Sequence, residues 1–175
     1  MIAEASGLAD VVGALPKYQN QSGHYAKVVI PAYNNKFFQE NEYETVHQGQ
    51  LKLGWFLFSY SVVKEKTNKL GFELYQIAIP ELFDRPNVYS YEDDTERFLS
   101  FQIAFLNWLT HWEHHPDIIH CHDHHTGLVP FMIKHCYQFK ILSSIPTIFT
   151  IHNAQYQGWM DWDKTNWLPN FDPWK

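Results

Sequence analysis

One short segment, His120–Gly127, concentrates side chains that could do chemistry. It reads HCHDHHTG and lies between a short apolar stretch and a helical pattern. Ligands in open α/β sheets bind at the carboxyl ends of strands, so this position favours a functional role over packing. Histidine and aspartate are good metal ligands, yet Asp123 comes one place too early for the HxHxDH pattern of metallo-hydrolases. A simpler alternative is that some of these histidines cap the helix or bond the backbone.

A second candidate, Thr150–Asn153, follows the next apolar stretch, with the polar segment Gln155–Gly158 behind it. Its histidine and asparagine would again lie at the ligand-binding edge of a sheet. A lone histidine at such an edge could be structural. Two candidate segments that follow neighbouring strands, however, predict one shared site rather than two unrelated packing histidines.

Two further segments carry weaker signals. Ser6–Asp10 is a small-residue turn that opens a helix, where free N–H groups and the positive dipole end suit a phosphate. Serine and glycine also start many helices as simple caps, which is the competing interpretation. Tyr91–Phe98 reads as an acidic helix start, and its simplest interpretation is an i,i+4 pair between Asp93 and Arg97, worth roughly 0.3 kcal/mol.

The candidate segments can form one site only in a fold that brings the ends of their strands together. The periodicity of apolar residues predicts such a fold, of the α/β class. The stripe of apolar residues from Leu8 to Leu15 predicts a helix, and Asp93–Trp112 predicts a second helix that is apolar on nearly all sides and therefore buried. From Ile118 onward, strand, helix and strand alternate at α/β spacing. The remaining expected elements are strands at Tyr25–Ile30, Trp55–Val63 and Phe72–Ile79 with a hairpin turn at Thr67–Gly71, a short strand at Asp117–His120, a helix at Thr126–Tyr137 and a buried strand at Pro146–Ile151.

Composition excludes several classes of protein. The 175 residues predict one domain, and 45% hydrophobic residues against 18% charged ones can bury a core. A net charge of −6 argues against a protein that binds nucleic-acid backbones. No apolar run is long enough to cross a bilayer, and no signal peptide is expected at the N-terminus. Cys121 and Cys136 form no CxxC motif, which predicts reduced, buried thiols in a cytoplasmic protein.

Several segments, in the same order along the chain, resemble motifs of bacterial glycogen synthases and plant starch synthases. Gly7–Lys17 resembles the opening motif of that family. His120–Pro130 is similar to its H-x-H-D-W-H-x-G-x-x-P segment, and Phe149–Gly158 is similar to its F-T-x-H-N-x-x-Y-Q-G segment. Residues of Tyr91–Phe98 fit a fourth stretch of the family. These ordered matches cover most of the chain.

The resemblance implies the GT-B fold, in which two Rossmann-like α/β domains face each other across a cleft. It implies transfer of glucose from ADP-glucose to the non-reducing 4-hydroxyl of an α-1,4-glucan, with retention and without a metal or other cofactor. Residues 1–175 would form a single partial domain, the N-terminal half of that fold with an added β-hairpin. By residue match, the resemblance implies catalytic roles for His152 and Asp123, and substrate binding by Gly7, Asp10, Tyr91, His125 and Asn153.

The sequence departs from the family pattern in three places. Glu4 stands where the family has a lysine that would meet the donor phosphate. His124 replaces a tryptophan, which removes one aromatic face for sugar stacking. The family's first strand and second domain have no counterpart, so we expect the partial domain alone to be inactive. We also expect the strands Tyr25–Ile30 and Asp117–His120 to lose a shared neighbour, which favours an abnormal sheet, a dimer or strand exchange between chains.

Three other interpretations remain open from the sequence. A stand-alone α-glucan-binding module would bind maltooligosaccharides without turning over ADP-glucose. A metallo-hydrolase built on the histidine cluster would hold stoichiometric zinc and lose its activity to chelators. The last alternative is a domain that binds nothing well by itself.

Overall fold

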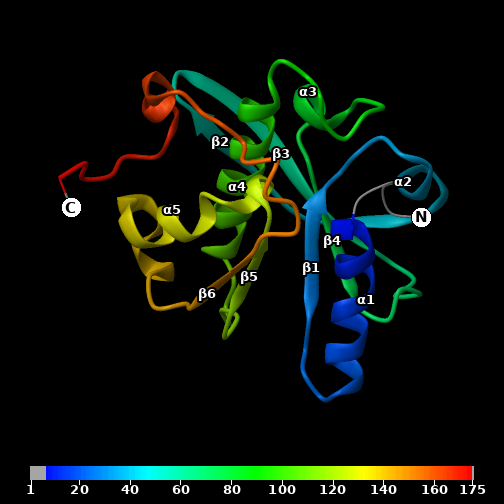
Figure 1. Ribbon diagram of the computed structural model, residues 1–175. Coiled ribbons are helices and arrows are strands. Elements are labelled where there is room, and N and C mark those ends of the chain that lie inside the picture. The colour runs from blue at the N-terminus through cyan, green and yellow to red at the C-terminus, as the bar shows by residue number, and fades with distance from the viewer. Residues whose placement is uncertain (1–6, 175) are drawn as a thin grey trace. The chain divides into compact units, whose positions relative to one another are not determined.

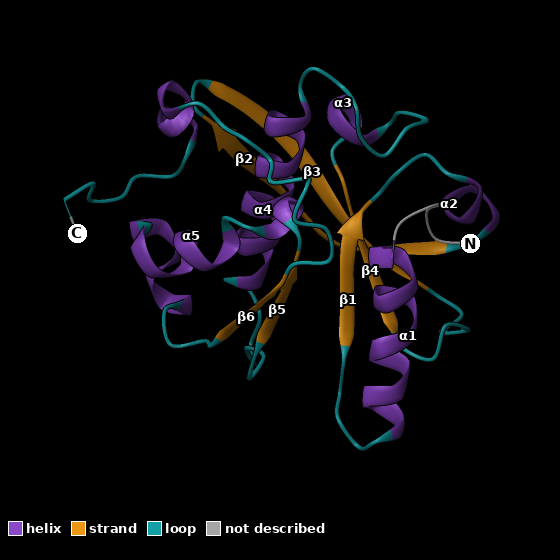
Figure 2. Ribbon diagram, viewed as in Figure 1, coloured by secondary structure: helices purple, strands orange, loops and turns teal. Residues whose placement is uncertain are grey.

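Strands and helices alternate along the chain of the computed structural model, which describes residues 7–174 (Figure 1). The described residues divide into two units. Unit 1 comprises the residues up to Gln48 and Ser59–Ser90, and unit 2 comprises Gly49–Phe58 and the residues from Tyr91 onward. The described strands form one sheet of four strands and one of two (Figure 2).

The bounds of the elements agree with most of the predicted ranges. The earlier elements are α1 (Gly7–Gln21), β1 (Lys27–Pro31), α2 (Lys36–Glu40), β2 (Tyr43–Leu53), β3 (Phe56–Glu65), β4 (Glu73–Ala78) and α3 (Pro80–Phe83). The later elements are α4 (Asp94–Leu109), β5 (Ile119–His122), η1 (His124–Thr126), α5 (Val129–His135), η2 (Tyr137–Leu142), β6 (Thr147–Thr150) and η3 (Trp162–Trp167), where η marks a 3-10 helix.

The four-stranded sheet has the order β1-β4-β3-β2, which places β4 in its interior. β1 runs parallel to β4 with Val29 opposite Tyr75, and β3 runs antiparallel to β4 with Val62 opposite Ile77. The middle of β4 is buried, as an inner strand should be. The antiparallel pair confirms the predicted hairpin, whose turn ends at Gly71 with a φ of 84° that glycine adopts without strain.

Helix α1 lies beside β1 and contacts it (Figure 1). Val12 of the helix contacts a buried cluster formed by Val28, Phe72 and Leu74. The helix is therefore held by burial of one apolar face rather than by its own propensity. Ser6, which was expected to open this helix, and Glu4 lie outside the described residues.

In unit 2, helix α4 is buried along nearly its whole length, which confirms the prediction from its apolar circumference. It packs against η1 and α5. The helix predicted over Thr126–Tyr137 is shorter than expected, because η1 occupies its first residues and α5 begins only at Val129. Pro130 lies in the first turn of α5, where its missing N–H costs no hydrogen bond. Among residues 7–174, no helix combines the length and apolar character that a membrane span requires.

The two-stranded sheet pairs β5 with β6 in parallel, and His122 lies opposite Thr150. The strand predicted over Pro146–Ile151 is present as β6, but its predicted burial is wrong, because Ile148 and Phe149 are 47% and 44% exposed. Within the described part of the chain, β6 hydrogen-bonds to β5 alone, so its other edge is uncovered. β1 and β5, which were expected to flank a missing strand, belong to different sheets. Strand exchange between chains stays a prediction.

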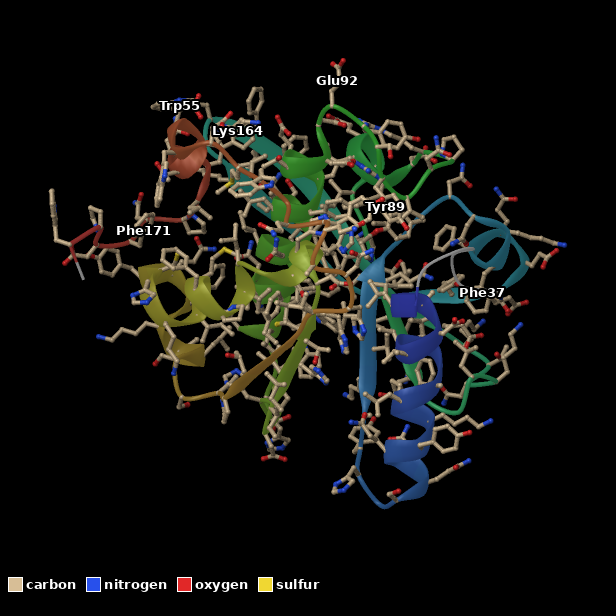
Figure 3. All side chains as sticks on the ribbon, in the orientation of Figure 1. Phe37, Trp55, Tyr89, Glu92, Lys164 and Phe171 are labelled. Atoms are coloured by element: carbon tan, nitrogen blue, oxygen red, sulfur yellow. The ribbon has the colours of Figure 1, made fainter. Side chains whose placement is uncertain are left out.

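Both cysteines are free and buried, as predicted. Burial raises the pKa of the Cys121 thiol to about 12 and that of the Cys136 thiol to about 11. The Cys136 thiol donates to the carbonyl oxygen of Pro169 at 3.4 Å, and Phe171 packs edge-on against Phe131 of α5 (Figure 3). These contacts hold the segment after η3 against α5.

A largely buried carboxylate links the strands of unit 1. Glu73 accepts hydrogen bonds at 2.6 Å from the ammonium of Lys64 and from the hydroxyl of Tyr25, and its Oε2 lies 3.6 Å from Nζ of Lys27. Burial alone would raise the pKa of Glu73. The hydrogen bonds from Lys64 and Tyr25 and the charge of Lys27 outweigh burial and lower that pKa to about 2.

We predict that Glu73→Gln lowers the free energy of unfolding by about 1 kcal/mol at pH 7, because two lysines lose a charged partner. The pKa of the folded state lies below the ordinary value of 4.5, so the carboxylate stabilises the fold above pH 4.5. That contribution is lost as the pH falls toward 2. Urea unfolding of native and variant chains at pH 7 and at about pH 3 measures both effects.

The control variant is Glu40→Gln, which removes an exposed i,i+4 pair with Lys36. We expect it to change the free energy of unfolding by less than about 0.5 kcal/mol. Equal losses in the two variants at pH 7 would contradict the stabilising role of Glu73.

Candidate active site

The parallel pairing of β5 and β6 brings the ends of both strands to the same edge of the sheet. β5 ends at His122 and is followed by Asp123, whereas β6 ends at Thr150. The N–H of Asp123 donates to the carbonyl oxygen of Thr150 at 2.9 Å. Its Oδ1 accepts from the N–H of His152 at 2.7 Å and from the N–H of Asn153 at 3.4 Å. The hydrogen bonds of Asp123 therefore link the two candidate segments, His120–Gly127 and Thr150–Asn153.

The backbone of Asp123 is strained. Its φ of 56° and ψ of −177° lie in a region that glycine adopts easily and other residues rarely do. Such a conformation costs about 1–3 kcal/mol and persists where surrounding contacts require it. Here the 8% exposed side chain and the backbone N–H of the same residue are both hydrogen-bonded. The strain thus marks a residue whose position is determined by the site.

Three histidine rings line up beside this aspartate. Nδ1 of His122 lies 2.9 Å from Nε2 of His152, and the two rings are inclined by only 13°. The ring of His120 lies 4.1 Å from that of His122, and its Nε2 is hydrogen-bonded to the hydroxyl of Thr150 at 2.7 Å. Burial, reinforced by the neighbouring histidines, lowers the pKa of His122 to about 4 and also lowers the pKa of His120. Both rings are therefore mainly neutral at pH 7.

A cavity of about 750 Å³ lies next to the strand ends. Its volume is in the range of small-molecule sites in proteins. Asp123 and Asn153 line it from the strand ends, Thr95 and Phe98 line it from α4, and the loop 154–160 completes the wall. Every lining residue belongs to unit 2. The cavity thus combines apolar surface with a few hydrogen-bonding groups.

His124, which stands where the resembled motif has tryptophan, packs beneath the loop that borders the cavity. A Cβ atom on Gly158 would lie 2.7–2.9 Å from three atoms of His124, and the φ of Gly158 is +62°. The position therefore requires glycine both for space and for backbone conformation. The ring of His124 also meets Phe98 edge-on at 5.9 Å. Burial lowers the pKa of His124.

The first turn of α4 is organised by an arginine whose side chain is completely buried. Arg97 forms an ion pair with Asp94 at 2.6 Å, and its guanidinium lies 4.7 Å from the ring centre of Tyr91. This ion pair joins residues three apart, whereas the predicted i,i+4 pair of Arg97 with Asp93 stays a prediction. Burial lowers the pKa of His125 to about 4, and its ring packs edge-on against Phe98 at 4.4 Å.

The structure brings together three of the residues singled out from the sequence: Asp123, His152 and Asn153. Tyr91 and His125 lie in the same unit, around the first turns of α4. The other two, Gly7 and Asp10, lie on the first turn of α1 in unit 1.

Sequence reasoning missed His122. Its signal was the i,i+2 spacing from His120, which puts both rings on one face of a strand. Among residues 7–174, no three histidine, cysteine, aspartate or glutamate side chains are placed to hold a metal ion, so the geometry gives the metallo-hydrolase alternative no support.

Comparisons with known proteins agree with the resemblance seen in the motifs. A family model described as the starch synthase catalytic domain matches residues 1–175. The glycogen synthase of Flavobacterium johnsoniae is 58% identical over 171 residues, which are 98% of this chain and 36% of the relative. The glycogen synthase of Geobacillus stearothermophilus is 39% identical over 158 residues, 89% of this chain and 32% of the relative.

A solved structure gives the same answer for the fold. The catalytic domain of starch synthase IV from Arabidopsis thaliana, bound to ADP and acarbose, matches with a TM-score of 0.80 and 29% identity. The match covers 90% of this chain and 32% of that one. It confirms the predicted fold class, a Rossmann-like N-terminal half of a GT-B architecture. The chain spans about a third of the length of the proteins that it matches.

We predict that Asp123→Ala raises the exchange rate of the His152 and Asn153 amide hydrogens about tenfold or more, because both lose their acceptor. The same variant should lower the free energy of unfolding by about 1–3 kcal/mol. Asp123→Asn keeps an Oδ1 acceptor and a residue type that tolerates positive φ, so it should retain most of the protection. Hydrogen exchange followed by NMR, together with urea unfolding, measures these effects. Unchanged exchange at both amides in Asp123→Ala would show that the carboxylate does not hold the segment.

Proposed function

Because this chain belongs to the family of starch synthase catalytic domains, we propose that it supplies one wall of the active site of a glycogen or starch synthase. The enzyme would be a hexosyltransferase that moves glucose from ADP-glucose to the non-reducing 4-hydroxyl of an α-1,4-glucan, with retention. The similar starch synthase IV domain from Arabidopsis thaliana is bound to ADP and acarbose, which supports a nucleotide donor and a glucan-like ligand.

The observation that carries this proposal is the hydrogen bonding of Asp123. It joins the two segments that resemble family motifs, and it does so at the wall of a cavity of about 750 Å³. The neighbouring histidines His122 and His125 are mainly neutral at pH 7, so they add no positive charge next to this site. Neutral donors and acceptors above apolar surface suit the hydroxyls and the C–H faces of a sugar.

The reaction sets requirements that the proposed residues can meet. The bond from C1 of glucose to the phosphate oxygen of ADP breaks, a bond from C1 to the glucan O4 forms, and O4 loses its proton. Charge that develops on the sugar ring is stabilised by fixed dipoles in an enclosed site. We assign His152 to contact with the transferred glucose and Asn153 to its hydroxyls. We assign Asp123 to positioning of both residues, because its Oδ1 accepts from their N–H groups.

The other residues implied by the resemblance are assigned to substrate binding. Tyr91, which precedes α4, and His125, which lies in η1, would act from positions packed against Arg97 and Phe98 of α4. Gly7 and Asp10 would act from the first turn of α1, where N–H groups suit the donor phosphates. Groups from outside this chain would be needed for turnover, so the chain alone should be inactive. The two free cysteines support a cytoplasmic location.

A second function, glucan binding without catalysis, is favoured by one observation. The cavity is built wholly from unit 2 of this chain, so its walls need no second domain. The chain by itself could then bind a glucan and transfer nothing. The two functions predict different results when this chain is part of a complete synthase. The first predicts that the synthase turns over ADP-glucose, and the second predicts glucan binding without turnover.

We predict that the 175-residue chain binds maltoheptaose with a dissociation constant on the order of 1 mM and releases no ADP from ADP-glucose. Asn153→Ala and His152→Ala should each weaken binding about tenfold, because Asn153 lines the cavity and His152 is the adjacent residue, bonded to Asp123 of the cavity wall. Isothermal titration calorimetry measures the binding, and a coupled assay measures ADP release.

The matched control is His24→Ala, which removes an exposed histidine of unit 1 and should bind like the native chain. Binding that is absent in the native chain, or unchanged in both cavity variants, would refute the proposed site. Release of ADP by the chain alone would refute the need for groups from outside it.

A further inference from the structure

His152 is held at two points by two consecutive residues of the neighbouring strand end. Asp123 accepts its backbone N–H at 2.7 Å, and Nδ1 of His122 lies 2.9 Å from its ring nitrogen Nε2. A neutral imidazole carries one N–H and one bare nitrogen, so one ring of this pair must donate and the other accept. Nε2 of His152 is engaged in either case, so the direction of that hydrogen bond determines whether the other ring nitrogen, Nδ1, accepts from a ligand or donates to it.

The surroundings of His122 favour its role as the acceptor. The titratable groups that face it are His120 and Asp123 on its own segment and His152 beyond β6. Burial and the two histidines lower its pKa to about 4, so its ring is neutral at pH 7. A neutral His122 whose proton lies on Nε2 can accept at Nδ1 from an Nε2–H group of His152. The opposite direction works only while Nε2 of His152 is bare.

We propose that His122 is a positioning residue whose Nδ1 accepts a hydrogen bond from Nε2–H of His152. This bond fixes the tautomer and the ring orientation of His152, and it leaves Nδ1 of His152 bare, as a hydrogen-bond acceptor for the ligand. The inference rests on the proposed function in one respect, because it names a sugar hydroxyl as that ligand. The ring of His120, whose centre lies 4.1 Å from that of His122 at a tilt of 30°, packs against the accepting ring.

The direct test is NMR of the chain labelled with ¹⁵N at histidine. Long-range ¹H–¹⁵N correlation at pH 7 reports which ring nitrogen carries the proton. We expect a single tautomer for His152 with Nε2 protonated, and a bare Nδ1 on His122. A proton on Nδ1 of His122, or a mixture of tautomers at His152, would overturn the proposal.

A matched pair of variants isolates the acceptor from the packing. In His122→Asn, the amide Oδ1 is attached to Cγ as the imidazole Nδ1 is, so it can accept from His152 in nearly the same place. His122→Leu has a similar size and shape but no acceptor. We expect the single tautomer of His152 to persist in His122→Asn and to become a mixture in His122→Leu. Equal spectra of His152 in the two variants would overturn the proposal.

Maltoheptaose titration of the same variants gives the functional readout. We expect His122→Leu to bind about tenfold more weakly than the native chain and His122→Asn to recover most of the affinity. His24→Leu, at an exposed position of unit 1, is the control for loss of a histidine. Backbone amide spectra establish whether each variant is folded. If His122→Leu does not fold, the tautomers measured in the native chain and in His122→Asn still determine the direction of the hydrogen bond between His122 and His152.

The tautomer of His152 is measured without a glucan. The proposed function and the proposed histidine pair can therefore be refuted independently. A native chain with the expected tautomer that binds no maltoheptaose would refute the proposed function and keep the histidine pair. If the chain binds maltoheptaose but His152 is a mixture of tautomers, the result supports the proposed function and refutes the proposed hydrogen bond from His152 to His122.

Discussion

The arrangement of the candidate site depends on the carboxylate of Asp123. Pairing of β5 with β6 sets His122 opposite Thr150, but it does not determine the path of the chain beyond Thr150. Asp123 determines that path by accepting the N–H groups of His152 and Asn153. In doing so it adopts a backbone conformation that glycine adopts more easily. The strain is tolerated because the backbone and the side chain of the same residue are both hydrogen-bonded.

Neutral imidazoles give this site its chemical character. Burial lowers the pKa of His122 and of His125 to about 4, and it also lowers the pKa of His120 and His124. A run of histidines that looks basic or metal-binding in the sequence is therefore a set of uncharged hydrogen-bonding rings in the fold. Uncharged rings lack the positive charge that makes hydrogen bonds to phosphates strong.

Local sequence patterns predicted the helices and strands. They could not predict the contacts between these elements. The apolar circumference of α4 and the apolar residues of β3 and β4 are properties of short segments, so the sequence predicted these elements. The exposure of Phe149 depends on what lies beyond the edge of β6, which no window of sequence contains. The contact between His122 and His152 depends on the register of two strands. The motifs predicted that the two segments share a site, but the register decided which rings touch.

The burial of Cys121 and Cys136 has a consequence for the reactivity of the whole chain. With pKa values of about 12 and about 11, fewer than about one thiol in a thousand is ionised at pH 7, and the thiolate is the form that reacts. Alkylating reagents and mild oxidants should therefore leave both side chains intact while the fold persists. A cysteine introduced at an exposed position would be the reactive thiol of choice, so a fluorophore or spin label could be attached there without removing the native cysteines.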